Sequence, residues 1–63
     1  MRVAAWEVVA GDEYQWLDNW YTVAEVTTRG PRVIIETTHK TSDGSPLTFY
    51  PTASQSEIVR RND

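Results

Sequence analysis

The chain has no cysteine among its 63 residues. Without cysteine, no disulfide can brace the fold, and the thiolate ligands of a structural zinc site are missing. A domain of this length lies near the lower limit at which a chain buries enough apolar surface to fold alone. One compact apolar cluster, or association with another chain, therefore has to supply the stability. We expect a single domain over residues 1–63.

Positive charge is also scarce. Nine acidic residues outnumber six basic ones, which gives a formal net charge of −3. Proteins that bind duplex nucleic acid usually carry a surplus of Lys and Arg against phosphate. The composition therefore disfavours a nucleic-acid partner, although a local basic face is compatible with an acidic total.

Long apolar runs are absent as well. The opening stretch, residues 1–10, is mostly apolar, but Glu7 interrupts it and it is too short to span a membrane. It also lacks the layout of a secretory signal. We expect a soluble, cytoplasmic protein that makes no membrane contact.

Catalytic and cofactor motifs are missing from the chain. No glycine-rich phosphate loop or dinucleotide fingerprint occurs, so we expect no cofactor. His39, Ser42 and Asp43 are residue types found in hydrolytic relays, but they fall within one turn. Residues so close together cannot easily form a relay, and turns favour Ser and Asp for backbone reasons. We expect a protein that is not an enzyme.

A calcium site could be drawn from Asp12, Glu13 and Asp18. Calcium loops need several oxygen ligands at regular spacing with a glycine turn inside. Here Gly11 precedes the acidic residues and Trp16 interrupts them. A solvated acidic loop fits this spacing better, and we expect no metal.

The chain does contain many β-branched and aromatic residues, which occur in short runs between turn residues. This pattern predicts an all-β fold of five short strands, with turns at Gly30-Pro31 and Asp43-Gly44. One short helical turn is expected at 52–56, before the last strand. The predicted strands are residues 3–9, 20–28, 32–39, 47–50 and 57–61.

The second of these runs predicts a bulge. Tyr21 and Val23 lie on one face of a strand, and Val26 is out of phase with them. A bulge near Ala24-Glu25 would return Val26 to the inner face. Five short strands with one long early loop favour a small closed barrel, because a flat sheet of this kind leaves open edges.

Several short motifs lie along nearly the whole chain: 8–12, Trp20–Val23 leading to Val26, 43–44, 47–49, Pro51 and 58–61. In this order they resemble a loose group of small SH3-like barrels from actinobacteria and their phages. The resemblance implies a five-stranded SH3-like barrel and says almost nothing about activity.

A comparison with eukaryotic SH3 domains is also possible. Residues 12–19 sit where those domains have a long acidic loop, Trp20 begins the second strand, and Pro51 begins the segment before the last strand. In those domains such residues bind proline-rich peptides, with acidic side chains meeting a basic residue of the peptide. This chain departs at two places: residues 52–56 contain no Tyr, and no paired Trp stands in mid-strand.

Large aromatic side chains are the strongest functional signal. Three Trp, three Tyr and one Phe can each bury about 150–250 Å². We expect Trp6 and Phe49 in the core. The five others (Tyr14, Trp16, Trp20, Tyr21 and Tyr50) exceed what a narrow barrel encloses, so at least two should face solvent. Trp16 and Tyr14 are the first choices because they lie on a loop. The alternative is that all the rings pack inward.

These features favour a non-catalytic protein-interaction module, such as a small phage or bacterial accessory protein. Aromatic anchors would supply the affinity, and acidic side chains would favour a basic partner surface. One alternative is a nucleic-acid or nucleotide-binding barrel that stacks bases on exposed rings. Another is an architectural subunit that self-associates. The predicted binding residues are Asp12, Glu13, Tyr14, Trp16, Asp18, Trp20, Tyr50 and Pro51.

Overall fold

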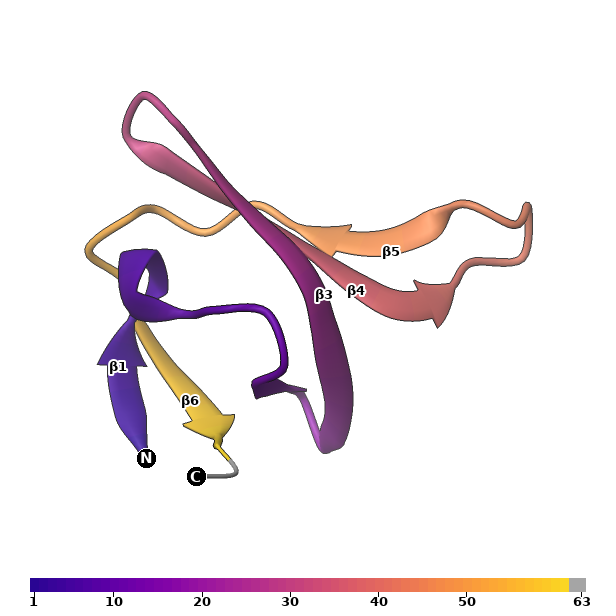
Figure 1. Ribbon diagram of the computed structural model, residues 1–63, viewed down its shortest axis with the longest axis horizontal. Coiled ribbons are helices and arrows are strands. Elements are labelled where there is room, and N and C mark those ends of the chain that lie inside the picture. The colour runs from indigo at the N-terminus through magenta and orange to yellow at the C-terminus, as the bar shows by residue number, and fades with distance from the viewer. Residues whose placement is uncertain (62–63) are drawn as a thin grey trace.

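The fold is known from a computed structural model, which describes residues 1–61. This part of the chain is all-β, as predicted (Figure 1). Its one helix, η1, is a three-residue 3-10 turn, and no helix there is long and apolar enough to cross a membrane. The elements in chain order are β1 (Arg2–Ala4), η1 (Ala5–Glu7), β2 (Glu13–Trp16), β3 (Asn19–Arg29), β4 (Arg32–Lys40), β5 (Pro46–Phe49) and β6 (Ser56–Arg60).

The six strands form one sheet in the order β1-β6-β2-β3-β4-β5, with every neighbouring pair antiparallel. β1 and β5 lie at the two ends of this order, so the sheet does not close. The prediction of a closed five-stranded barrel is therefore wrong in both closure and strand number. Figure 1 shows β1 and β6 on one side of the molecule, β4 and β5 on the other, and the long β3 between them.

Two local features account for the different strand count. The predicted first strand, 3–9, ends at Ala4, where η1 begins, and the Glu7 carboxylate accepts the Ala4 N–H at 2.8 Å. The predicted long loop instead contains β2. Trp16 pairs with Asn19 around a two-residue turn, so the loop folds as a hairpin with β3.

The expected bulge is confirmed. The register of β3 against β4 shifts between Val23 and Glu25, and beyond the shift Val26 packs against the core. The turn at Gly30-Pro31 is confirmed too, with Gly30 in the left-handed region at φ 57°.

The predicted helical turn at 52–56 is wrong. This segment forms a single hydrogen-bonded turn instead of a helix, in which Gln55 N–H donates to Thr52 O at 2.9 Å, and its other backbone groups bond to neighbours in space. Ala53 N–H donates to Pro31 O at 2.8 Å, and Gln55 O accepts the N–H of Ala5 at 2.8 Å. Ala53 O also accepts the N–H of Trp6 at 3.2 Å. The segment therefore ties η1 to the β3–β4 turn.

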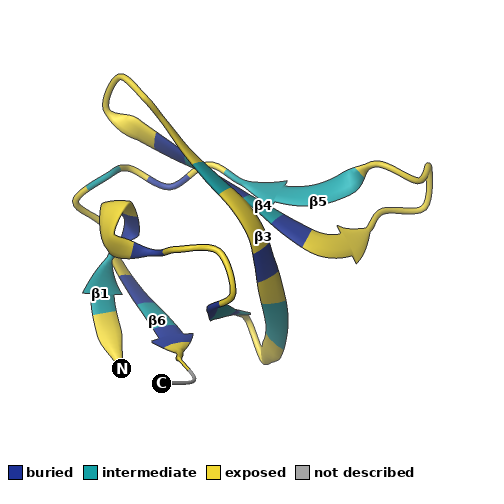
Figure 2. Ribbon diagram, in the orientation of Figure 1, coloured by how far each residue is buried: buried dark blue, intermediate teal, exposed yellow. Residues whose placement is uncertain are grey.

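The core is small and consists mostly of valine. Residues 33, 35 and 37 of β4 are buried while their neighbours are more exposed, as the period of two predicts (Figure 2). Phe49 packs against the core, but the prediction that Trp6 is buried is wrong. Trp6 is 62% exposed because the adjacent Ala5 takes the inward position of η1. The buried apolar residues are Ala5, Val8, Tyr14, Val23, Val33, Ile35 and Val59.

Candidate functional site

The candidate site is a groove of about 220 Å³ between β2, the end of β5 and the segment that leads to β6. Four of its lining residues are aromatic, and its polar side-chain groups include a guanidinium, an amide and two phenols. The lining residues are Tyr14, Trp16, Arg32, Phe49, Tyr50, Pro51 and Gln55.

The β2–β3 hairpin places two of these rings. Tyr14 and Trp16 are two positions apart in β2 and therefore point to the same face. Tyr14 reaches the core and is 2% exposed, whereas Trp16 lies at the outer end of the strand and is 46% exposed. The expectation that Tyr14 faces solvent is wrong, because residues 13–16 form a strand whose inner position it occupies. The expectation that Trp16 is exposed is confirmed.

Phe49 joins these rings to the opposite wall. Its centroid lies 5.0 Å from that of Tyr14, 5.3 Å from Trp16 and 5.8 Å from Tyr21. Such distances are typical of favourable ring pairs. Tyr50 follows at the end of β5 and is 61% exposed, and Pro51 is buried. The groove is thus lined by one ring that packs against three others, Phe49, and by two exposed rings, Trp16 and Tyr50.

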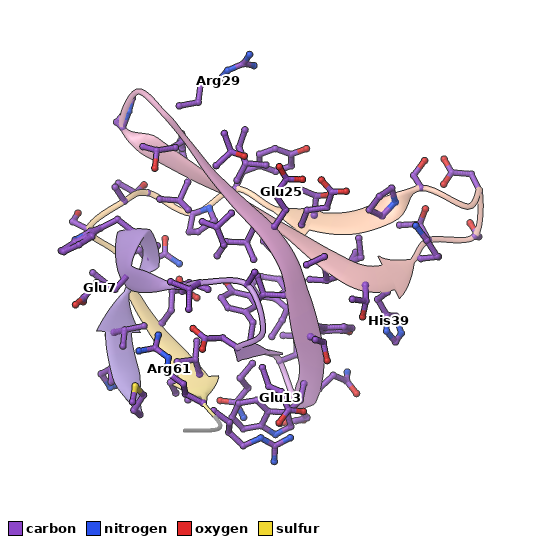
Figure 3. All side chains as sticks on the ribbon, in the orientation of Figure 1. Glu7, Glu13, Glu25, Arg29, His39 and Arg61 are labelled. Atoms are coloured by element: carbon purple, nitrogen blue, oxygen red, sulfur yellow. The ribbon has the colours of Figure 1, made fainter. Side chains whose placement is uncertain are left out.

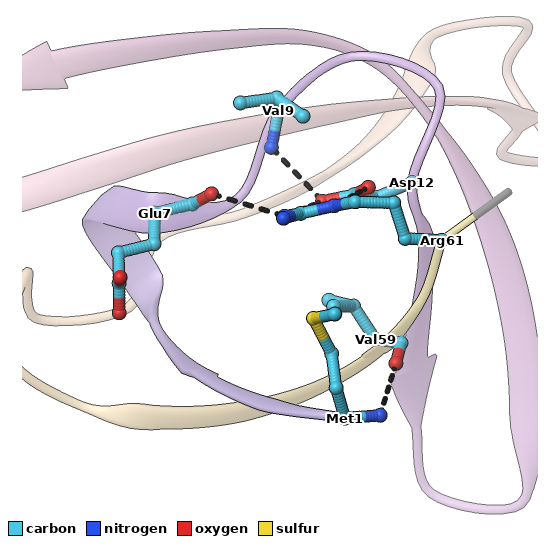
Figure 4. Close-up of polar contacts among 6 residues, drawn as sticks. All are labelled: Met1, Glu7, Val9, Asp12, Val59 and Arg61. Atoms are coloured by element: carbon cyan, nitrogen blue, oxygen red, sulfur yellow. Dashed lines mark hydrogen bonds and ion pairs between the residues drawn. The ribbon is translucent and has the colours of Figure 1, made fainter. Parts of the chain in front are cut away.

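Asp12 lies outside the groove and is buried, with 1% of its surface exposed. Arg61 donates two hydrogen bonds to its carboxylate, at 2.7 and 2.8 Å, and Val9 N–H donates a third at 3.1 Å (Figure 4). The Arg61 hydrogen bond is the main reason that the pKa of Asp12 falls below its usual 3.8, and burial opposes it. Asp12 was predicted to offer its charge to a partner, and in the structure that charge is buried and already paired with Arg61.

Glu13 and Trp20 lie on the opposite face of the hairpin. Glu13 pairs in register with Arg60, and their side chains form an exposed ion pair at 3.2 Å. The Arg60 guanidinium lies 3.9 Å from the centroid of the Trp20 ring. Asp18 is exposed in the turn after Trp16 and does not line the groove. The structure therefore brings together only Tyr14, Trp16, Tyr50 and Pro51 of the eight predicted residues.

The polar wall contains two residues outside the predicted binding set, Arg32 and Gln55. Arg32 donates from Nη1 to Tyr50 O at 3.1 Å, and within residues 1–61 no carboxylate forms an ion pair with it. Gln55 donates from Nε2 to Glu57 Oε1 at 2.7 Å. Burial, and then hydrogen bonding to Glu57, raise the pKa of Tyr14 above its usual value. The sequence did not predict that Arg32 lines a binding groove, because only the pairing of β4 with residue 52 brings it there.

The groove can hold apolar and aromatic groups and donate hydrogen bonds from Arg32. His39 lies elsewhere, with its ring 5.0 Å from that of Tyr21. Asp43 accepts hydrogen bonds from the Thr41 hydroxyl and the Ser45 N–H, which lower its pKa and hold a turn. In the described part of the chain, no three His, Cys, Asp or Glu side chains gather where a metal ion could sit.

No protein-family model matches the chain, and no curated protein and no solved structure matches it.

Proposed function

We propose that this domain is a non-catalytic protein-interaction module that binds a partner protein through the aromatic groove. The observation that carries the proposal is the exposure of two aromatic side chains, Trp16 and Tyr50, in the groove that Phe49 also lines. The proposal includes an accessory role in a phage or bacterium, which follows only from the sequence resemblance.

A few residue types dominate the binding energy of protein interfaces. Trp, Tyr and Arg are the side chains most often found at interaction hot spots. Trp16 is held on a strand and its ring packs against Phe49, so little conformational freedom remains to be lost on binding. Pockets for drug-sized ligands measure about 300–1,000 Å³. A smaller groove of about 220 Å³ is better matched to a few side chains of a protein partner.

The charge of the site differs from the charge that the sequence implied. Asp12 and Glu13 are paired with Arg61 and Arg60, so much of their charge is already balanced within the domain. The aromatic rings and the donors of Arg32 therefore carry the proposed recognition.

A displayed library of random peptides, selected on the immobilised domain, tests this function. Trp16→Ala and Tyr50→Ala should each weaken the selected binders by about thirtyfold, the usual effect of removing a hot-spot ring. Trp6→Ala is the matched control, because Trp6 is also exposed but does not line the groove. Binding that is unaffected by Trp16→Ala and Tyr50→Ala would exclude the groove as the site.

Single-stranded nucleic acid is the second candidate partner. The position of Arg32 beside two exposed rings favours it, because such proteins combine cations with rings on which bases stack. Titration with an oligothymidylate at several salt concentrations separates the two functions. Binding that weakens steeply as salt rises would support nucleic acid, and no binding at low salt would remove it.

A further inference from the structure

The outer face of the β3–β4 hairpin carries an ordered pattern of charge. Directly paired residues of antiparallel strands point to the same side of the sheet. Glu25 pairs with Glu36, and Arg29 pairs with Arg32. Between them Thr27 pairs with Ile34, while the core-facing pair of Val26 and Ile35 confirms that these three pairs face outward. We name the six residues the charged strip: Glu25, Thr27, Arg29, Arg32, Ile34 and Glu36.

Like charges face each other at both ends of the charged strip. Glu25 opposite Glu36 is unfavourable, and so is Arg29 opposite Arg32, because like charges in direct cross-strand pairs repel. Within residues 1–61, none of the four forms an ion pair. Figure 3 shows Arg29 at the tip of the hairpin, pointing away from the molecule, and Glu25 farther down β3.

The two ends of the strip are too far apart to neutralise each other within one molecule. Arg32 and Glu36 are four positions apart along β4, which is about 13 Å at 3.3 Å per residue. The middle of the strip is less polar: Ile34 is half-buried, and Tyr50 is exposed nearby, at the end of β5. A surface with a basic end, a weakly polar centre and an acidic end is complementary to the same surface of a second copy that is rotated by 180°.

We propose that the charged strip is an interface between two copies of this chain, related by a two-fold axis through the strip. In this arrangement the arginine pair of each copy meets the glutamate pair of the other, so all four like-charge pairs gain opposite-charge neighbours. Two-fold contacts of this kind use the same patch on both subunits. The proposal does not rest on the function proposed for the groove, although Arg32 belongs both to the strip and to the lining of the groove.

The strip is short, so the association is expected to be weak. Stable dimers bury about 800 Å² on each partner, close to a fifth of this domain's total surface of 4270 Å². Each copy also carries a net charge of −3, which opposes association. The dimer should therefore form at high protein concentration and low salt, and should dissociate as salt screens the pairs.

Sedimentation equilibrium over a range of protein concentrations provides the test. The wild type should rise from its monomer mass of 7.2 kDa toward twice that value at low salt. An acidic variant (Arg29→Glu with Arg32→Glu) and a basic variant (Glu25→Lys with Glu36→Lys) should each stay monomeric alone. An equimolar mixture of the two should associate again as a heterodimer. Each variant has a like-charge pair at both ends of the strip, as the wild type does, so neither adds a new kind of repulsion within the domain. Thermal unfolding should therefore show that both variants are folded.

A matched control separates this interface from general attraction between charged proteins. Arg2→Glu with Lys40→Glu makes the same charge change as the acidic variant at exposed positions outside the strip. This control should associate with the basic variant at least tenfold more weakly than the acidic variant does. A wild type that stays monomeric at every concentration, self-association that survives the charge changes, or a mixture that stays monomeric would each overturn the proposal.

Discussion

Removing only Arg61 from its ion pair with Asp12 should destabilise the domain more than removing both charges together. A domain of 63 residues has a free energy of unfolding of about 3–9 kcal/mol, at 0.05–0.15 kcal/mol per residue. Removing one partner of a buried pair costs about 3–5 kcal/mol, because it leaves an uncompensated charge. Arg61→Ala leaves the Asp12 carboxylate buried with one donor, the Val9 N–H. The Arg61 side chain is 31% exposed, so water can partly replace it beside Asp12. We therefore expect the free energy of unfolding to fall by about 3 kcal/mol, the lower end of this range.

Removing the charge as well should restore much of this loss. Asp12→Asn with Arg61→Ala takes away the buried charge, and the Asn oxygen can still accept the Val9 N–H. The double variant should lose only about 1 kcal/mol, the net value of an ordinary hydrogen bond. It should therefore be about 2 kcal/mol more stable than Arg61→Ala alone. Urea unfolding followed by tryptophan fluorescence measures the difference, because three Trp report on the fold.

The neighbouring arginine provides the control for this pair. Arg60 makes an exposed ion pair with Glu13 and lies over the Trp20 ring, so Arg60→Ala should cost about 1 kcal/mol. The reasoning is refuted if Arg61→Ala costs no more than Arg60→Ala, or if the double variant is less stable than Arg61→Ala.

Acid supplies a second test of the same pair. The folded-state pKa of Asp12 lies below the usual 3.8, so its stabilisation is complete above about pH 4 and is lost as the pH falls through the lower folded value. Wild type should therefore lose stability below pH 4. The gap between Arg61→Ala and the double variant should narrow there, because protonation removes the buried charge in Arg61→Ala. If the difference in free energy of unfolding between these two variants stays constant below pH 4, a buried Asp12 charge is not what destabilises Arg61→Ala.

Two further predictions concern the β2–β3 hairpin. Leu17 is exposed and has φ 57°, a region that favours glycine, so Leu17→Gly should raise the free energy of unfolding by about 0.5–1 kcal/mol. Asp18→Gly, at a position without positive φ, should give no gain in the same urea unfolding assay. The pKa of Tyr14 is raised by burial and by Glu57, so its stabilisation is complete below pH 10 and is lost as the pH rises toward the folded value. The free energy of unfolding of the wild type should fall more steeply above pH 10 than that of Tyr14→Phe. If the two fall in parallel, the buried phenol of Tyr14 does not cause the loss.

Much of the sheet could be predicted because its signals are local. The β-branched residues of β3 and β4 alternate with the period of a strand, and Gly30-Pro31 marks the turn between them. The bulge near Ala24 followed from a phase change in the same alternation. β2 was missed because the strand has only four residues, one of which is acidic, and because the turn that follows it lacks glycine. Residues 52–56 were misread because small polar residues suit a helical turn as well as an irregular segment.

The candidate site could be predicted only in part. The abundance of rings indicated that some face solvent, and Trp16 and Tyr50 do. The residue types did not reveal which acidic side chains were already neutralised. Asp12 and Arg61 are 49 positions apart, and only the folded chain brings them together.

The sequence alone determined the all-β class, the two long central strands and the bulge, because alternation and turn chemistry depend on neighbouring residues. The tertiary structure decided that the sheet stays open, that Tyr14 is buried and Trp6 exposed, and that Arg32 lines the groove. These outcomes depend on which strands pair and in which register. Register places each side chain on the inner or outer face, and it arises from contacts between residues far apart in the chain.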